Sequence, residues 1–354
     1  MSELNRQETN RHDGAAVNAD VADSEVLALF QAERHRLWSL AYRMLGIADD
    51  ADEVMQDAWL RWQTVDRSTV VNPAAWLTTA TSRLSLDRLR SAQRRRESYV
   101  GPWLPEPVET QRLLGSSSDY ETDADPAEVA VLAETVSIGF LAVMERLNPV
   151  ERAVFLLHDV FALPFDEIAP VVDRSPAATR QIAVRARARI EAERPRFAPD
   201  PSDVEQLAEA FLRAAASGDQ SRLSDLLTED VVLLSDGGAK ARAARHPIVG
   251  HARVSRFLTG LAQRVSEEFA FHPVSVNGSF AIYVTLNGEP DSVFMMSWLN
   301  NGGVGGHNTD DYTADEHMVD EYTADEYRVD RVYVVRNPDK LARFAEQWRV
   351  ALGS

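Results

Sequence analysis

Two interruptions rich in loop-forming residues constrain the fold of this chain more than any other feature of its sequence. The first, at residues 99–125, contains three prolines and a Gly-Ser-Ser-Ser run at residues 115–118. The second, at residues 199–201, is Pro-Asp-Pro. Because proline and glycine disfavour continuous helices, we expect these stretches to join separately folded parts. A length of 354 residues allows two or three such parts.

The parts differ in their residue patterns. The stretches before and after the first interruption are helical in pattern, whereas the last part mixes helices with β-rich runs at Ser279–Leu286 and 293–299. We therefore predict a multidomain protein with these limits: a disordered tail at residues 1–23, an all-α domain at 24–98, a linker at 99–127, an all-α domain at 128–196, and a mixed domain at 202–354.

The charge balance argues against a protein that grips DNA on its own. The chain has 55 acidic and 37 basic residues, a net charge of −18, and its basic side chains cluster at residues 83–96 and 174–189. An acidic body repels phosphates, so we expect weak binding to free DNA and a partner that delivers the chain to it.

Other classes of protein are excluded by composition. The absence of cysteine excludes disulfides, thiolate nucleophiles and cysteine-based metal sites. There is no signal pattern and no apolar run near the roughly 18 residues that a membrane span needs. We expect a cytoplasmic protein that uses no cofactor and no metal.

The first helical part contains an acidic helix. Apolar residues at helical spacing, from Ala51 to Trp62, predict one buried face. The charged positions between residues 44 and 60 are acidic, with no basic residue among them. Such acids suit a solvated face near a helix N-terminus, and they equally suit a docking surface for a basic partner.

The next helix ends in arginines. We expect it to begin at Asn72-Pro73, a capping residue followed by proline at the first helical position. Five arginines lie between residues 88 and 96. A run of charged residues usually forms only a solvent-exposed surface. Arginines near aromatic residues such as Trp76 and Tyr99 are also typical of sites that bind single-stranded nucleic acid.

The second helical part has the pattern of a helix-turn-helix. Asn148-Pro149 opens one helix, a short helix follows at Phe165–Val172, and Ser175-Pro176 opens a third. In the third helix the apolar positions recur every four residues and are expected to face the core, whereas Thr179, Arg180, Gln181, Arg185 and Arg187 are expected to project outwards. Arginine and glutamine at such positions can read base edges in a major groove.

These motifs together resemble sigma-70-type RNA polymerase sigma factors. Residues 48–59 (ADDADEVMQDAW) resemble region 2.2, which docks on the polymerase clamp. Residues 76–91 resemble regions 2.3 and 2.4, which melt and read the −10 element, and residues 147–189 resemble region 4, which reads the −35 element. Nothing resembles regions 1.1 or 3, and that absence defines the extracytoplasmic-function group. The resemblance implies an alternative sigma factor, not an enzyme, that binds core RNA polymerase and promoter DNA and initiates transcription.

The resemblance also implies which residues act. Polymerase binding is assigned to Asp49, Asp50, Asp52, Glu53, Gln56 and Asp57. Reading of the −10 element is assigned to Trp76, Arg83, Asp87, Arg88, Arg90, Arg94, Arg95 and Arg96. Reading of the −35 element is assigned to Ser175, Ala177, Thr179, Arg180, Gln181, Arg185 and Arg187.

Three further motifs resemble the SigJ-like subgroup, in which a SnoaL-like domain is fused to the sigma regions. They are WLPEP at residues 103–107, DGGAK at residues 236–240 and NPDKL at residues 337–341. The subgroup implies an interdomain regulatory set: Trp103, Leu104, Pro105, Asp236, Gly237, Gly238, Lys240, Asn337, Pro338, Asp339 and Lys340. Three departures are Ala239 in place of a glycine, Pro170 inside the short helix, where it is expected to shorten the helix, and Arg83 where many relatives have asparagine.

The last domain resembles the SnoaL/NTF2-like α+β cone at residues 204–234. Such cones enclose a pocket suited to small apolar ligands, so a small molecule is a further candidate partner. Some relatives are cyclases that use an aspartate or histidine, for which the candidates here are Asp236, His246, His251 and His272. These residues equally suit surface or core-edge positions, and we expect a regulatory lid that contacts the linker.

An acidic repeat lies outside the resemblance. Residues 311–320 are nearly repeated at residues 321–330, after a Gly/Asn-rich stretch. The repeat suits either a solvated extension of a β-hairpin or an acidic flap that competes with DNA for a basic surface. Two other functions stay open: a ligand-responsive repressor that uses the helix-turn-helix alone, and a cyclase or isomerase with a DNA-binding appendage.

Overall fold

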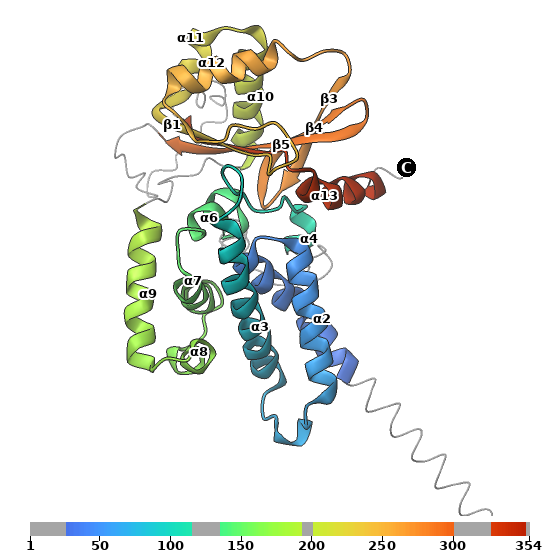
Figure 1. Cartoon of the computed structure of the whole chain (residues 1–354), viewed down its shortest axis with the longest axis vertical. Helices are drawn as coiled ribbons and strands as arrows, with labels where there is room; N and C mark the ends of the chain where they lie inside the picture. The colour runs from blue at the N-terminus through green and yellow to red at the C-terminus, as the bar shows by residue number, and fades with distance from the viewer. Residues whose placement is uncertain (1–25, 115–134, 193–200, 301–326, 352–354) are drawn as a thin grey trace, which may run out of the picture. The chain divides into compact units, whose positions relative to one another are not determined.

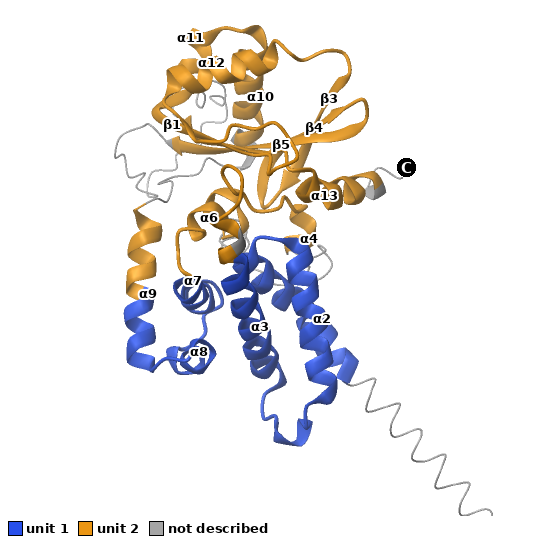
Figure 2. Cartoon of the chain, in the orientation of Figure 1, with its two compact units in different colours: residues 1–92, 149–183 blue, residues 93–148, 184–354 orange. Residues whose placement is uncertain are grey.

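The computed structural model describes residues 26–114, 135–192, 201–300 and 327–351. They form two compact units (Figure 2): the first takes residues up to 92 and 149–183, and the second takes residues 93–148 and those from 184 onwards. The first unit draws on both predicted helical domains, whose limits stay a prediction. Within the described ranges, no helix is long and apolar enough to span a bilayer.

The first unit is helical throughout its described part (Figure 1). Its first helix covers residues 26–45. The other elements are α2 (Ala48–Thr64), the 3-10 turn η1 (Arg67–Thr69), α3 (Pro73–Arg96), α7 (Pro149–Phe155), the π-helical turn η3 (Leu156–Val160), α8 (Phe165–Val172) and α9 (Pro176–Glu191). The last turn of α3 and the second half of α9 are grouped with the second unit.

The apolar face predicted for the acidic helix is confirmed in α2. Its buried side chains are Ala48, Ala51, Val54, Met55, Ala58 and Trp62. Trp62 is 1% exposed, and its indole N–H donates to the carbonyl of Val26 at 3.1 Å. Burial of so large a side chain contributes roughly 2–3 kcal/mol, so this face fixes α2 and leaves its acidic positions on the other side.

A buried arginine joins α7 to the first helix of the unit. Arg152 is 1% exposed and donates from Nε and Nη2 to the carbonyl of Arg43, at 3.2 and 3.1 Å. Arg43 in turn lies over the ring of Phe161 at 5.7 Å. A guanidinium satisfied in this way holds the two helical segments in one unit, because its removal would leave a buried carbonyl without these donors.

The predicted helix starts are confirmed. The Asn72 side chain accepts from the amide of Ala75 at 3.1 Å at the start of α3, and the Ser175 hydroxyl accepts from the amide of Ala178 at 3.3 Å at the start of α9. Helix α8 keeps its predicted bounds, so the expectation that Pro170 shortens it is wrong. Pro170 lies close to the C-terminal end, where only one backbone hydrogen bond is lost, and Asp173 ends the helix in the left-handed conformation with φ 57°.

The second unit contains the described linker residues and an α+β part. Its helices are α4 (Thr110–Leu114), α6 (Ile138–Met144), α10 (Pro201–Ser217), α11 (Gln220–Asp225), α12 (His251–Ala262) and α13 (Pro338–Ala351). Its strands are β1 (Leu227–Asp236), β2 (Ile248–Val249), β3 (Phe269–Val276), β4 (Ser279–Leu286), β5 (Glu289–Asn300) and β6 (Tyr327–Val335). The strand predicted at Ser279–Leu286 is confirmed with the same bounds, and the run 293–299 lies inside β5.

The strands form one six-stranded sheet in the order β2-β1-β6-β5-β4-β3. The β1–β6 pair is parallel, and the other neighbours are antiparallel. Helices α10, α11 and α12 cover one face (Figure 1). The predicted fold class is confirmed: all-α segments are followed by an α+β domain, with the helix-on-sheet layout expected of a SnoaL-like domain.

Two Asn-Gly turns shape the edge of this sheet. Asn277-Gly278 joins β3 to β4 and Asn287-Gly288 joins β4 to β5. All four residues have positive φ, between 53° and 80°, as the type I′ turn of a two-residue hairpin requires. These pairs are a strong hairpin signal that is visible in the sequence.

The two faces of the sheet carry separate apolar cores. Because side chains alternate along a strand, Val332 and Val334 of β6 pack under α10 to α12, whereas Tyr333 and Val335 face the other side. The second core is closed by residues of α13, by Leu104 of the linker and by Ile138 of α6. The linker is thus part of the core of the second unit.

Candidate functional site

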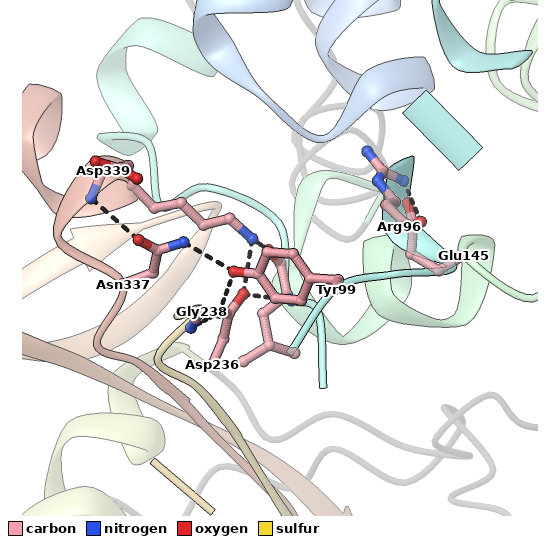
Figure 3. Close-up of polar contacts among 9 residues, drawn as sticks. Arg96, Tyr99, Glu145, Asp236, Gly238, Asn337 and Asp339 are labelled. Atoms are coloured by element: carbon pink, nitrogen blue, oxygen red, sulfur yellow. Dashed lines mark hydrogen bonds and ion pairs between the residues drawn. The ribbon is translucent and has the colours of Figure 1, made fainter. Parts of the chain in front are cut away.

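Asp236 is the centre of a buried polar cluster. It is the last residue of β1 and is fully buried. Its carboxylate accepts from the Tyr99 hydroxyl at 2.6 Å, the Leu104 amide at 2.8 Å, the Gly238 amide at 3.1 Å and the Lys340 ammonium at 2.7 Å (Figure 3). A carboxylate with four donors is well compensated for its burial. We call Tyr99, Trp103, Leu104, Asp236, Asn337 and Lys340 the linker cluster.

Lys340 ties the linker to the domain. It lies in the first turn of α13, is 5% exposed, and donates to the Leu104 carbonyl as well as to Asp236. Its ammonium also lies 4.2 Å from the ring centroid of Trp103 and 5.3 Å from that of Tyr99. Burial lowers the pKa of Lys340 to about 8, although the charge of Asp236 acts in the opposite direction. Burial and the neighbouring Asp236 carboxylate raise the pKa of the Tyr99 hydroxyl.

The edge of the cluster is polar, with Asn337 buried and the Lys240–Asp339 pair exposed. The Asn337 amide donates to the Tyr99 hydroxyl at 2.8 Å, and Lys240 pairs with Asp339 at 2.6 Å. Gly237 leaves no room for a side chain, since a Cβ there would collide with the carbonyl of Ala241. Gly238 has φ 54°, which favours glycine. Of the remaining residues predicted for interdomain regulation, Pro105 is buried and Pro338 is exposed.

Several residues of this region were missed or assigned elsewhere by sequence reasoning. Tyr99 was noted only as an aromatic near the arginines. Arg96, assigned to the −10 element, lies 3.5 Å from the ring centroid of Trp103 and pairs with Glu145, with its side chain 14% exposed. Asn277 is fully buried: its side chain accepts from the Val108 amide at 3.0 Å and donates to the Val136 carbonyl at 2.9 Å. Only its Asn-Gly turn was readable from sequence.

The acids assigned to polymerase binding lie along α2. Asp49, Glu53 and Gln56 are exposed, and Asp50 is half-buried. Asp52 accepts from the indole N–H of Trp38 at 2.6 Å. The last two carboxylates, Glu53 and Asp57, both pair with Arg88 of α3.

The residues assigned to the −10 element lie on α3. Trp76 is half-buried and its ring lies 5.4 Å from that of Trp62, whereas Arg94 is exposed. Arg90 pairs with Asp87 within the helix at 3.3 Å. The side chain of Arg95 lies outside the described part.

Arg83 makes a long-range contact within the first unit. Its Nη2 donates to the carbonyl of Pro170 at 2.9 Å. This carbonyl belongs to the last turn of α8, where no following turn of the helix supplies an N–H. Arg83 thus satisfies the end of a helix in the predicted region 4.

The residues assigned to the −35 element lie on α9, with one correction. Ala177, Arg180, Gln181 and Arg185 are exposed, Ser175 caps the helix, and Arg187 is half-buried. The expectation that Thr179 projects outwards is wrong. Thr179 is fully buried, and its hydroxyl donates back to the carbonyl of Ser175 at 3.0 Å.

The candidate catalytic residues are not gathered in one place. Asp236 belongs to the linker cluster, while His246 and His251 are exposed. His272 is half-buried on β3, and its Nε2 lies 3.1 Å from the Thr285 hydroxyl. Among the described residues, no group of three or more histidine, aspartate or glutamate side chains could hold a metal. Of the acidic repeat, residues 311–326 lie outside the described part, and residues 327–330 begin β6.

Comparison with known proteins agrees with this layout. The family model for Sigma-70 region 2 matches residues 29–95, and that for Sigma-70 region 4 matches residues 139–190. The chain is 41% identical over 258 residues to the ECF RNA polymerase sigma factor SigJ of Mycobacterium tuberculosis (strain ATCC 25618 / H37Rv), which covers 72% of this chain and 79% of the relative. It is 33% identical over 208 residues to the probable ECF RNA polymerase sigma factor SigI of the same strain, covering 58% of this chain and 68% of the relative.

A solved structure extends the likeness to nearly the whole chain. The crystal structure of the Mycobacterium tuberculosis extracytoplasmic function sigma factor SigJ superimposes with a TM-score of 0.63 at 32% identity, over 89% of this chain and 98% of that chain. The helical segments and the two matched regions define a sigma-70-type factor. The chain belongs to the extracytoplasmic-function family of RNA polymerase sigma factors.

Proposed function

We propose that this chain docks on the clamp of core RNA polymerase through α2, reads the −10 element with α3 and the −35 element with α9, and is regulated through its linker cluster. Membership of the sigma factor family supports the partners, polymerase and promoter DNA. Polymerase and its promoters are in the cytoplasm, so the proposal places the chain there.

The acidic surface of α2 supports the docking step. Its apolar face is buried in the core, and the carboxylates from Asp49 to Asp57 lie on the other side, where Asp49 and Glu53 are exposed to a partner with basic side chains. Complementary charges of this kind speed association and fix orientation. The net charge of −18 also supports docking on polymerase, because a chain this acidic needs polymerase to bring its arginines to DNA.

The exposed polar groups of α9 support reading of the −35 element. Arg180, Gln181 and Arg185 are exposed along α9, and the first two lie in its N-terminal half, the part of a recognition helix that contacts base edges. Arginine pairs with guanine and glutamine with adenine in the major groove. Thr179 takes no part in this proposal, because it is buried.

The single observation that carries the regulatory part is the hydrogen bonding of Asp236. Its carboxylate and Lys340 together hold the backbone of Leu104 on both its N–H and its carbonyl group. The linker between the two sigma regions is thereby fixed to the C-terminal domain. We propose that this domain restrains the factor overall and that its first part is needed for activity.

The domain itself acts as a regulatory element and not as an enzyme in this proposal. Asp236 is fully buried among four donors, which leaves it poorly placed to take a proton from a substrate. Between the sheet and α10 to α12, the described part of the domain holds a packed apolar core, so binding of a small apolar ligand there would require side chains to move apart. A repressor that uses α9 alone would have no need for the region 2 that residues 29–95 match.

The test is run-off transcription with core polymerase on genomic fragments. Wild-type protein is compared with Asp49→Asn/Asp50→Asn, and with Glu205→Gln/Glu209→Gln on α10 as a control of equal charge change. We expect transcripts with the wild type and the control. The α2 variant should give fewer transcripts, because its binding to polymerase is roughly ten-fold weaker. No transcript with any protein, despite DNA binding by the chain alone, would instead favour the repressor.

The regulatory part is tested with chains that end at successive positions after residue 200. We expect low activity for the full chain, higher activity when the C-terminal part is shortened, and loss of activity when the whole domain is removed. Equal activity for all chain lengths would contradict this part of the proposal and leave the docking and promoter-reading steps standing.

A further inference from the structure

Arg88 connects two surfaces of the first unit that carry different proposed roles. Its side chain projects from α3, the helix proposed to read the −10 element. Its Nη1 pairs with Glu53, and its Nη2 pairs with Asp57 at 2.8 Å. Both carboxylates belong to α2, the helix proposed to dock on polymerase. They are four residues apart, one helical turn, so a single guanidinium reaches both.

The pairing limits what Arg88 can offer to DNA. Its side chain is 27% exposed, and N–H groups on both terminal nitrogens are directed to carboxylates. The three charges sum to −1, which repels a phosphate at this point of the surface. Arg88 is thus less available to DNA in the protein alone than its place on α3 suggests.

The neighbouring arginines of α3 differ in this respect. Arg90 pairs with Asp87, a residue of the same helix, so that pair involves the proposed DNA surface only. Arg94 is exposed, and no ion pair of its side chain is seen among the described residues. Arg88 therefore joins the two surfaces, and Arg94 provides a matched residue that does not.

Glu53 and Asp57 can each form an ion pair with Arg88 or with a basic group of a partner. Their side chains are 63% and 42% exposed, so a cationic surface can approach both carboxylates from solvent. A basic group that pairs with them lowers the negative charge around Arg88 and competes for the same oxygen atoms. If a basic partner that pairs with Glu53 and Asp57 strengthens DNA binding by Arg88, then DNA bound to Arg88 strengthens the binding of that partner by the same factor.

We propose that Glu53 and Asp57 hold Arg88 in the protein alone, and that a basic surface of core polymerase takes these carboxylates and releases Arg88 to a DNA phosphate. Polymerase docking and DNA binding are then coupled through three side chains. This inference rests on the proposed docking of α2. It explains in chemical terms why an acidic chain would bind promoter DNA only together with polymerase.

The expected size of the coupling is modest. Exposed ion pairs are weak and are screened by salt, so releasing both pairs at low ionic strength corresponds to a change of about five- to ten-fold in affinity for DNA. Such a factor is readily measured by fluorescence anisotropy with a short labelled single-stranded DNA. Sequence specificity is not needed, because the released contact is to a phosphate.

The first experiment uses the full chain without polymerase. Glu53→Gln/Asp57→Asn is compared with Asp49→Asn/Asp50→Asn, which makes the same charge change on the same helix without touching Arg88. We expect the first variant to bind the single-stranded DNA about five-fold more tightly than the second, and Arg88→Ala in the same chain to remove this difference. Equal affinities for the two variants, or a difference that survives Arg88→Ala, would overturn the inference.

The second experiment adds core polymerase. Arg88→Ala is expected to leave DNA affinity nearly unchanged in the protein alone and to lower it several-fold in the complex, whereas Arg94→Ala lowers it by the same factor in both. A thermal melt checks that each variant is folded. An equal effect of Arg88→Ala in both states would refute the release step. Failure of the wild type to bind polymerase would refute the docking proposal, and the first experiment would still decide whether Glu53 and Asp57 mask Arg88.

Discussion

Replacing Lys340 with methionine should weaken the attachment of the linker to the C-terminal domain. Methionine keeps an unbranched apolar stem, one atom shorter than lysine, and removes the charged ammonium group. In the variant, the Asp236 carboxylate stays fully buried with three donors in place of four, and the Leu104 carbonyl loses its ammonium donor. Removing one partner of a buried pair costs about 3–5 kcal/mol, and the three remaining donors favour the lower end of that range.

A loss of about 3 kcal/mol should be clear in thermal unfolding. For a unit of this size it corresponds to a decrease in melting temperature of roughly 6–12 °C. The matched control is Lys240→Met, because the pair of Lys240 with Asp339 is exposed, at 61% and 64%, and is worth at most about 1 kcal/mol. Calorimetry gives the melting temperatures, and amide exchange at residues 99–108 reports whether the linker itself is released.

A second variant isolates the pair. Asp236→Asn/Lys340→Met removes both charges, and it should be no less stable than Lys340→Met alone because no uncompensated charge stays buried. Equal melting temperatures for Lys340→Met and Lys240→Met would refute this explanation of the cluster. So would a double variant whose loss of stability equals the sum of the losses in Asp236→Asn and Lys340→Met.

Three further predictions follow from the site. The pKa of Lys340 is lowered to about 8 from 10.5, so between these values the unfolded chain binds more protons and stability should rise with pH from 8 towards 10. The neutral amine, unlike methionine, keeps its N–H donors to Asp236 and the Leu104 carbonyl, so the rise should be absent in Lys340→Met, as urea titrations at each pH measure. Asn277→Ala should lose about 2–3 kcal/mol in urea unfolding, because the Val108 amide and the Val136 carbonyl lose buried partners, whereas Asn287→Ala, in the same kind of turn without those contacts, should lose about 1 kcal/mol. Thr179→Ala should lower the melting temperature without changing which promoters are transcribed, whereas Gln181→Ala should reduce the discrimination among bases at one −35 position about ten-fold, as measured by transcription from promoters with base substitutions. A change of promoter specificity in Thr179→Ala alone would show that Thr179 does not stay buried on DNA.

Helix starts and strands were predictable from sequence because their signals are local. The caps at Asn72 and Ser175 and the strand at Ser279–Leu286 depend on neighbouring residues and on a two-residue alternation. The burial of Thr179 was not predictable in the same way, since position on a helix surface depends on what packs against it. The role of Arg96 in contact with Trp103 likewise depends on how the chain turns after α3.

Except for Tyr99, the residues of the linker cluster were found by resemblance, but their pairing was not. The motifs supply two lysines and two aspartates, and their spacing does not say which lysine meets which aspartate. The structure pairs Lys340 with Asp236 in the core and Lys240 with Asp339 at the surface. Tyr99 carries no motif of its own, so its hydrogen bond to Asp236 could be seen only once the fold had brought the two together.

Asn277 has a consequence for how this linker can change in evolution or be engineered. One buried side chain holds both Val108 and Val136, so the ends of the intervening stretch of chain are anchored at the same residue. The entropic cost of joining two fixed points by a flexible chain grows slowly in general, by about 0.6 kcal/mol for each doubling of the chain length. Insertions, tags or a designed protease site between these anchors should therefore leave the two ends in register with the sheet, because both ends stay bonded to the same side chain.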